Sequence, residues 1–139
     1  MDYVVEVTST FETEDGEDSM TVTCPAMYRY TPERRLIRYD EYTDEGACMH
    51  TRVVSTSEGV DIIREGNRAL DLRLRPGQCF SQEYNVGYGM VTLEYVSRGI
   101  EDCLNEQGGT LTVKYKMDIG GVGTFNTVVM SVRKTEAAE

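Results

Sequence analysis

The sequence predicts an all-β chain that forms a single antiparallel up-and-down β-barrel of about nine to eleven short strands. Apolar and polar side chains alternate with a period of two along most of the chain, which is the pattern of strands with one buried face. We find no convincing long stretch with apolar residues at helical spacing. Turn signals recur about every ten residues, so hairpin-length links favour a meander over long crossing connections.

The first strand is predicted at residues 3–11, where one face has Tyr3, Val5, Val7, Ser9 and Phe11 and the other has Glu6, Thr8 and Thr10. Two later strands have a charged residue on their more apolar face. The residues of these two faces are Ile37, Tyr39 and Glu41 in one strand, and Val60, Ile62 and Arg64 in the other. Glu41 and Arg64 are therefore expected to point into the barrel.

Residues 84–95 read YNVGYGMVTLEY, and the phase of the alternation changes between Tyr88 and Val91. One residue is extra, as in a β-bulge or a tight corner, and Gly89 has the backbone freedom that this position needs. A phosphate-binding loop would be followed by a helix, whereas here another strand follows. We therefore predict structural roles for Gly89 and for Gly66, which lies in an earlier turn signal.

Two strands near the C-terminus complete the predicted barrel. In residues 110–118 the apolar residues share one face, and they are Leu111, Val113, Tyr115 and Met117. The segment 123–134 is apolar on both sides, with Val128, Met130 and Val132 on one face and Phe125 and Val129 on the other. Two-sided apolar character is typical of a strand that also contacts a partner. A homodimer is therefore one alternative for this protein.

The 139 residues suit one domain with its own core, a barrel at about residues 3–133 followed by a disordered tail at 134–139. The N-terminal MDYVVEVTST has no basic start and no long apolar stretch, so neither a signal peptide nor a membrane span is expected. Four cysteines, at positions 24, 48, 79 and 103, form no C-x-x-C pair. We therefore expect a cytoplasmic protein with reduced thiols, without a metal or other cofactor.

Acidic residues outnumber basic ones by 24 to 14, for a net charge of −10. Such a field repels phosphate backbones and anionic lipid surfaces, so neither nucleic acid nor a membrane is expected as a partner. A small-molecule ligand remains compatible with this charge. The simplest role of the acidic surface is solubility.

Four segments, in this order and at these separations, resemble the YwiB-like family of small bacterial proteins of unknown function. They are YDE at 39–41, IIREG at 62–66, YNVGYG at 84–89 and GGTLTVKYKMD at 108–118. The resemblance implies a calycin-type barrel, the architecture that lipocalins and fatty-acid-binding proteins share. It implies no known reaction. The positions that match the family's motifs are Tyr39, Glu41, Arg64, Gly66, Tyr84, Tyr88 and Gly89.

An inward glutamate and an inward arginine are expected to pair, because burying a charge costs free energy unless it is paired and hydrogen-bonded. Tyrosines complete the predicted cluster, which consists of Tyr39, Glu41, Arg64, Tyr84 and Tyr88. As a ligand site, Arg64 would bind an anion and the tyrosines an apolar or aromatic body. As a structural element, the same ion pair would close one end of the barrel or hold its register, with no ligand.

Small-molecule binding in the barrel is the leading functional hypothesis, and no catalytic residue is assigned. The alternative is a cofactor-free enzyme in which tyrosine hydroxyls act with Glu41 as acid/base and Arg64 holds a carboxylate substrate. His50 shares a face with Cys48. We expect this face on the outside of the barrel with no pocket beside it, and therefore no nucleophilic pair.

Overall fold

The computed structural model of the protein describes residues 3–42, 48–66, 70–85 and 89–135. Within these ranges the chain forms ten strands and no helix. The strands are β1 (Tyr3–Thr13), β2 (Gly16–Tyr30), β3 (Arg35–Tyr42), β4 (Cys48–Thr56), β5 (Gly59–Gly66), β6 (Leu70–Leu74), β7 (Cys79–Asn85), β8 (Met90–Asn105), β9 (Gly108–Ile119) and β10 (Val122–Lys134). All pairs of neighbouring strands are antiparallel. The predicted all-β class and strand number are confirmed.

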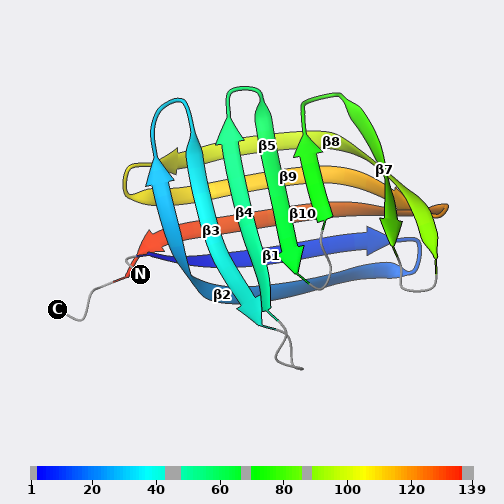
Figure 1. Ribbon diagram of the computed structural model, residues 1–139, viewed down its shortest axis with the longest axis horizontal. Coiled ribbons are helices and arrows are strands. Elements are labelled where there is room, and N and C mark those ends of the chain that lie inside the picture. The colour runs from blue at the N-terminus through cyan, green and yellow to red at the C-terminus, as the bar shows by residue number, and fades with distance from the viewer. Residues whose placement is uncertain (1–2, 43–47, 67–69, 86–88, 136–139) are drawn as a thin grey trace.

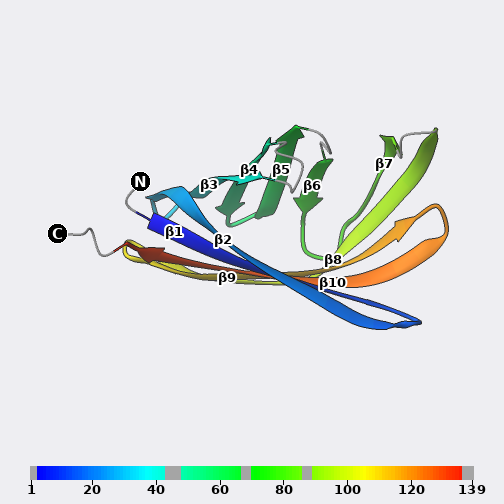
Figure 2. The same ribbon diagram turned by 90° about the horizontal axis from the view of Figure 1, so that it is seen from below.

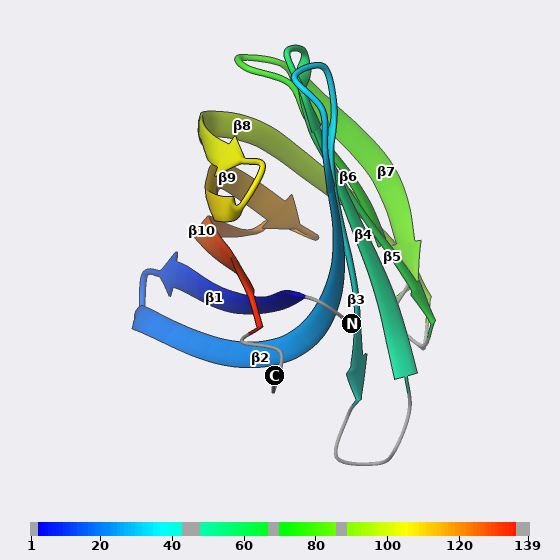
Figure 3. The same ribbon diagram turned by 90° about the vertical axis from the view of Figure 1, so that its left-hand side faces the viewer.

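The ten strands form one sheet in the order β6-β5-β4-β3-β2-β1-β10-β9-β8-β7. Neighbours in the chain are neighbours in the sheet, except that β1 pairs with β10 while β6 and β7 occupy the two edges. The sheet coils so that β3 to β6 cross over β8, β9, β10 and β1 (Figure 1). Figures 2 and 3 show these two layers from the side, with the core between them. The up-and-down barrel is therefore confirmed and nearly closed.

The core follows the predicted alternation. Val5 and Val7 are buried in β1. In β9 the whole predicted apolar set is buried, whereas Lys114 and Lys116 between its members are exposed. One face of each strand therefore fills the interior and the other meets solvent.

Strand β10 presents apolar side chains on both faces, as predicted. Val128, Met130 and Val132 are buried in the barrel. On the opposite face Phe125 is 37% exposed and Val129 is half-buried. The outer face of β10 is therefore partly apolar. The homodimer stays a prediction.

The phase change near Gly89 is a corner between two strands and not a bulge within one. Strands β7 and β8 pair as far as Asn85 and Met90, so Gly89 lies in their connection. Of the two predicted alternatives for Gly89, a corner between strands agrees with this pairing, and a bulge within one strand does not. The register shift in this part of the sheet lies further along β8, between Ser97 and Gly99.

The seam between the edge strands β6 and β7 is bridged by side chains. The backbone N–H of Arg73 in β6 donates a hydrogen bond to Tyr95 Oη in β8, at 2.8 Å. Gln82 Nε2 in β7 donates to the backbone oxygen of Asp71 in β6, at 2.6 Å. Backbone groups at a sheet edge need partners when they leave water. Here side chains supply them in place of a strand ladder.

The chain ends beyond β10, whose last residue is Lys134. The predicted disordered tail at 134–139 lies, from residue 136 onward, outside the described residues. No helix long and apolar enough to span a membrane occurs among the residues that the structure describes.

Candidate functional site

Three polar side chains form one row across the inner face of β3, β4 and β5. Thr51 lies directly opposite Tyr39 on one side and Arg64 on the other. Directly opposed residues of antiparallel strands point to the same face. Tyr39 and Thr51 are only 3% and 2% exposed, and Arg64 is half-buried. The structure thus brings the predicted residues Tyr39 and Arg64 together and adds Thr51; we call these three residues the inner row.

The inner row is short of hydrogen bonds. Tyr39 Oη, Thr51 Oγ1 and Arg64 Nε are buried and have no hydrogen-bond partner within the described part of the chain. The Thr51 hydroxyl is near enough to Tyr39 to lower its pKa as a hydrogen-bond donor does, yet the two hydroxyls lie outside full hydrogen-bonding geometry. A buried polar atom without a partner costs about 1–3 kcal/mol. Native proteins contain few of them, so three in one row require an explanation.

The opposite wall of the barrel adds polar groups from β8 and β9. Burial raises the pKa of Tyr115 in β9, and the positive charge of the Arg64 guanidinium partly offsets this effect. Arg64 is therefore close enough to the opposite wall to act on it electrostatically. Tyr115 is the strand partner of Ser97. Ser97 Oγ is a fourth buried atom without a partner among the described residues. Unsatisfied polar groups therefore line both walls.

The tyrosine of the inner row keeps its proton at neutral pH. Burial raises the pKa of Tyr39 to about 12; the Arg64 guanidinium acts against this shift and the Glu41 carboxylate adds to it. A protonated phenol donates one hydrogen bond. Together with Thr51 and the Arg64 guanidinium, Tyr39 makes the inner row a set of donors, and donors bind anions.

The predicted ion pair between Glu41 and Arg64 is wrong. The ion pairs among the described residues are Arg35–Asp102, His50–Asp40 and Arg75–Asp61. Glu41 lies opposite Met49, and so one inward-facing position further along β3 than the inner row. The two charged residues share a face, as predicted, but cross-strand register places them in different rows.

The remaining predicted site residues lie elsewhere or cannot be placed. Tyr84 is in β7, opposite Val91 in β8, and β7 is an edge strand that does not pair with β3, β4 or β5, the strands of the inner row. Tyr88 is outside the described residues. Gly66 ends β5, opposite Met49.

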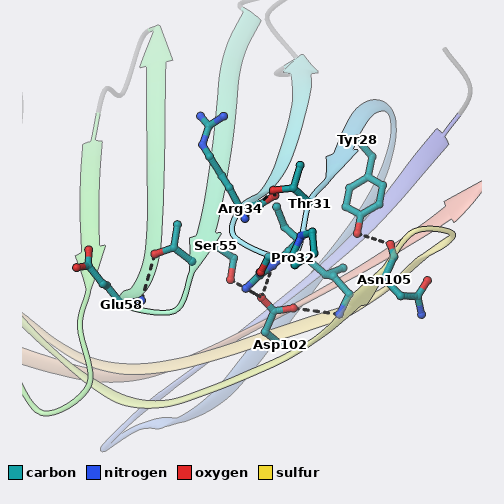
Figure 4. Close-up of polar contacts among 11 residues, drawn as sticks. Tyr28, Thr31, Pro32, Arg34, Ser55, Glu58, Asp102 and Asn105 are labelled. Carbon is teal, nitrogen blue, oxygen red and sulfur yellow. Dashed lines mark hydrogen bonds and ion pairs between the residues drawn. The ribbon is translucent and has the colours of Figure 1, made fainter.

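A second polar cluster, which we call the Asp102 network, lies at the other end of the same strands (Figure 4). Asp102 in β8 accepts hydrogen bonds from Arg35 Nε at 3.0 Å, Arg35 Nη2 at 2.7 Å, and Ser55 Oγ. Its second oxygen accepts the Leu104 N–H at 3.0 Å. Close by, Tyr28 Oη donates to the Asn105 carbonyl at 2.7 Å. Burial alone would raise the pKa of Asp102, but these hydrogen bonds and the arginine charge lower it.

Sequence reasoning missed the Asp102 network, although a signal for it was present. Asp102 alternates with Ile100 and Leu104, so it is a charged residue within an apolar set, as Glu41 and Arg64 are. Its partner Arg35 is 67 residues away in the chain. This network contains an ion pair that joins β8 to β3, strands that are not neighbours in the sheet; the sequence had suggested an interior ion pair of different residues.

The outer face of β2 to β5 has a groove of about 610 Å³, whose lining includes Arg38, Asp40, His50 and Arg52. His50 is on the outer surface, as predicted, and its Nδ1 lies 2.7 Å from Asp40 Oδ1. The expectation of no pocket beside His50 is wrong, because long outward side chains of four adjacent strands build walls that alternation along one strand does not indicate.

Cys48, His50 and Asp40 form a cluster on the outer face, but the thiol and the imidazole are not aligned as a nucleophile and its base. Cys48 Sγ lies 4.0 Å from both ring nitrogens of His50. A base that activates the thiol would hold one ring nitrogen closer to Sγ than this. His50 Nδ1 lies 2.7 Å from Asp40 Oδ1, which leaves Nε2 to face the thiol.

Comparisons with known proteins agree with the observed fold. A family model described as "Domain of unknown function (DUF1934)" matches residues 5–130. Among curated proteins none matches. The crystal structure of the ywiB protein from Bacillus subtilis is similar, with 19% sequence identity, a TM-score of 0.82, and coverage of 96% of this chain and 91% of that chain. The resemblance to the YwiB-like family is therefore confirmed, and at this identity the structural likeness shows the fold alone.

Proposed function

The chain belongs to the DUF1934 family, whose function is unknown, and from this premise we propose that the barrel binds a small organic anion at the inner row. The observation that carries the proposal is the set of buried donors of Tyr39, Thr51 and Arg64, which lack partners among the described residues. A bound anion would supply those partners. It would also compensate the half-buried guanidinium, which has no carboxylate beside it in the part of the chain described.

The chemistry of the row favours a carboxylate with an apolar body. A guanidinium binds a carboxylate through two parallel hydrogen bonds, and the neighbouring hydroxyls can donate to the same oxygens. The surrounding walls are apolar and aromatic, with Tyr115 on the far side and Ile62 next along β5. Ligand sites commonly combine mostly apolar walls with a few convergent polar groups. The calycin-type architecture is compatible with such a site, although fold analogy alone is a weak argument.

The enzyme alternative has less support than ligand binding. With a pKa of about 12, Tyr39 is a hydrogen-bond donor at neutral pH and a poor general base. Glu41, the suggested acid/base, forms no ion pair with Arg64 in the described part of the chain. A binding role requires neither residue to transfer a proton.

The proposal is tested by calorimetric titration of the purified protein with a series of monocarboxylates of increasing apolar size, each beside its primary amide. We expect the carboxylate to bind at least about tenfold more tightly than the amide, because charge-assisted contacts are roughly twice as strong as neutral ones. Arg64→Met should remove this preference. Arg29→Ala, which alters an exposed arginine on the outer face of β2, should leave it unchanged.

Equal binding of carboxylate and amide would refute the proposal, as would full carboxylate affinity in a folded Arg64→Met protein. Native mass spectrometry of the protein from its own source gives an independent readout. A retained small acid that is lost in Arg64→Met would identify the ligand.

Two further features are proposed on separate grounds. A reducing cytoplasmic location is supported by the four cysteines, which are all free thiols. A homodimer through the outer face of β10 is supported by the exposed Phe125 and the half-buried Val129 on that face. Light scattering that gives a monomer mass at high concentration, and no change on Phe125→Ser, would exclude this dimer.

A further inference from the structure

We propose that Asp40, Cys48 and His50, on the outer face of the β3–β4 hairpin, form a binding site for a divalent transition metal ion of the zinc class. Cys48 and His50 are two residues apart in β4, so they project from the same face. Asp40 in β3 lies directly opposite His50. Two strands thus present a thiol, an imidazole and a carboxylate, three of the side chains that bind zinc in proteins.

The three donor atoms are already close to ligand spacing. All of them lie within 4.8 Å of one another. The bond lengths of tetrahedral zinc, about 2.3 Å to sulfur and about 2.0–2.1 Å to nitrogen or oxygen, separate neighbouring donors by about 3.3–3.6 Å. The Cys48–His50 distance of 4.0 Å must therefore shorten slightly and the His50–Asp40 distance of 2.7 Å must lengthen. Rotation of exposed side chains can do both without moving the strands.

Charge and donor type indicate which ions would bind. A thiolate, a carboxylate and a neutral imidazole together have two negative charges, which a divalent ion balances. Thiolate and imidazole ligands select zinc and its softer neighbours, whereas calcium and magnesium prefer all-oxygen sites. The net charge of −10 also raises the local concentration of cations.

Three protein ligands leave a fourth position open, as in zinc sites that retain a water molecule. Asp40 and His50 belong to the lining of the outer groove. Arg38 and Arg52 lie directly opposite each other one outward position further along the same two strands. An anion in the groove could therefore contact the open position and both arginines.

The experiment is a titration of the fully reduced protein with Co²⁺, followed by displacement with Zn²⁺. We expect a thiolate-to-cobalt charge-transfer band that saturates at one ion per chain and disappears when zinc is added. Cys48→Ser should abolish the band. Cys103→Ser and Cys79→Ser, which alter the two exposed cysteines outside the cluster, should retain it.

Competition with a chromophoric chelator measures zinc affinity in the same variants. His50→Ala and Asp40→Asn should each weaken zinc binding at least about tenfold, since even residues that only orient zinc ligands affect affinity by about 10–100-fold. His50→Ala and Asp40→Asn also test the metal-site proposal if Cys48→Ser fails to fold. The proposal is overturned if no thiolate band appears, if the band survives in Cys48→Ser, or if zinc affinity is unchanged in His50→Ala.

Discussion

The two polar clusters inside the barrel differ in how completely their groups are satisfied. In the Asp102 network, Asp102 accepts four hydrogen bonds from protein donors, three of them from Arg35 and Ser55. In the inner row, about 13 Å further along β3 at the usual rise per residue, three buried atoms have no partner among the described residues. Both clusters place polar groups in apolar walls. The Asp102 network is thus satisfied by groups of the protein itself, whereas the inner row has buried donors for which the described residues supply no acceptor.

The physical basis of this comparison is the asymmetry of buried polar groups. A satisfied buried ion pair contributes little net stability, but removing one of its members leaves an uncompensated charge and is costly. A buried donor that already lacks a partner behaves in the opposite way, because its removal relieves a desolvation penalty. Substitutions in the two clusters should therefore change stability in opposite directions.

The largest effect is expected for Asp102→Ala. It should lower the free energy of unfolding by about 3 kcal/mol, because Arg35, only 13% exposed, loses its counter-charge. Asp61→Ala is the matched control, since its pair with Arg75 is more exposed, and it should cost about 1 kcal/mol or less. Urea denaturation measures both values. Equal losses of unfolding free energy would show that the Asp102 network is no more important for stability than an exposed ion pair.

Arg64→Met should have the opposite sign. Because the guanidinium Nε is buried without a partner in the described chain, we expect the ligand-free protein to keep its stability or gain about 1 kcal/mol. Arg35→Met, at the other cluster, should destabilise instead. If Arg64→Met costs more than about 2 kcal/mol, the arginine is a structural element and the binding proposal is weakened.

Two tyrosine substitutions compare the two clusters by removing a single hydroxyl from each. Tyr28→Phe removes the hydroxyl that donates to the Asn105 carbonyl at 2.7 Å and should cost about 1 kcal/mol. Tyr39→Phe removes a hydroxyl without a partner among the described residues and should be neutral or slightly stabilising. Both rings are buried to a similar degree, so the difference between the variants reports the hydroxyl. A larger loss in Tyr39→Phe than in Tyr28→Phe would contradict the assignment.

The smallest expected effect is a difference in acid sensitivity. The pKa of Asp102 is lower in the folded protein than its ordinary value of 3.8, so the folded state favours the carboxylate. The resulting stability is present above about pH 4 and is lost as the pH falls through the folded-state pKa. The Asp102→Asn protein should therefore lose less stability than the parent below about pH 4. Parallel acid slopes in the two proteins would show that Asp102 is not the titrating group.

Much of the architecture could be predicted because alternation is a property of consecutive residues. The buried face of β9 was correct residue by residue. In β1 Val5 and Val7 are buried, whereas Phe11 on the same predicted face is 36% exposed. Glu41 and Arg64 are in strands whose inward faces were assigned correctly. The predicted ion pair between Glu41 and Arg64 was wrong because it required the register between strands, which the pattern within one strand does not give. Parity says that two residues share a face, but only register says that Thr51, and not Glu41, lies beside Arg64.

The same reason explains the clusters that sequence reasoning missed. Asp102 and Arg35 are 67 residues apart, and no local pattern links them. Asp40 and His50 are ten residues apart and face each other only because the β3–β4 hairpin has its particular register. The cysteine pattern gave no reason to propose a metal site, because Asp40, the proposed third ligand, comes from the neighbouring strand.

By itself the sequence determined that this chain is all-β, where most of its strands run and which side chains face inward, because a strand's two faces follow from the order of its own residues. Only the tertiary structure decided which polar groups meet, where the seam lies between β6 and β7, and which buried donors have no partner among the described residues. Those features depend on register between strands and on the coiling of the whole sheet, and these are set by packing among residues distant in the chain.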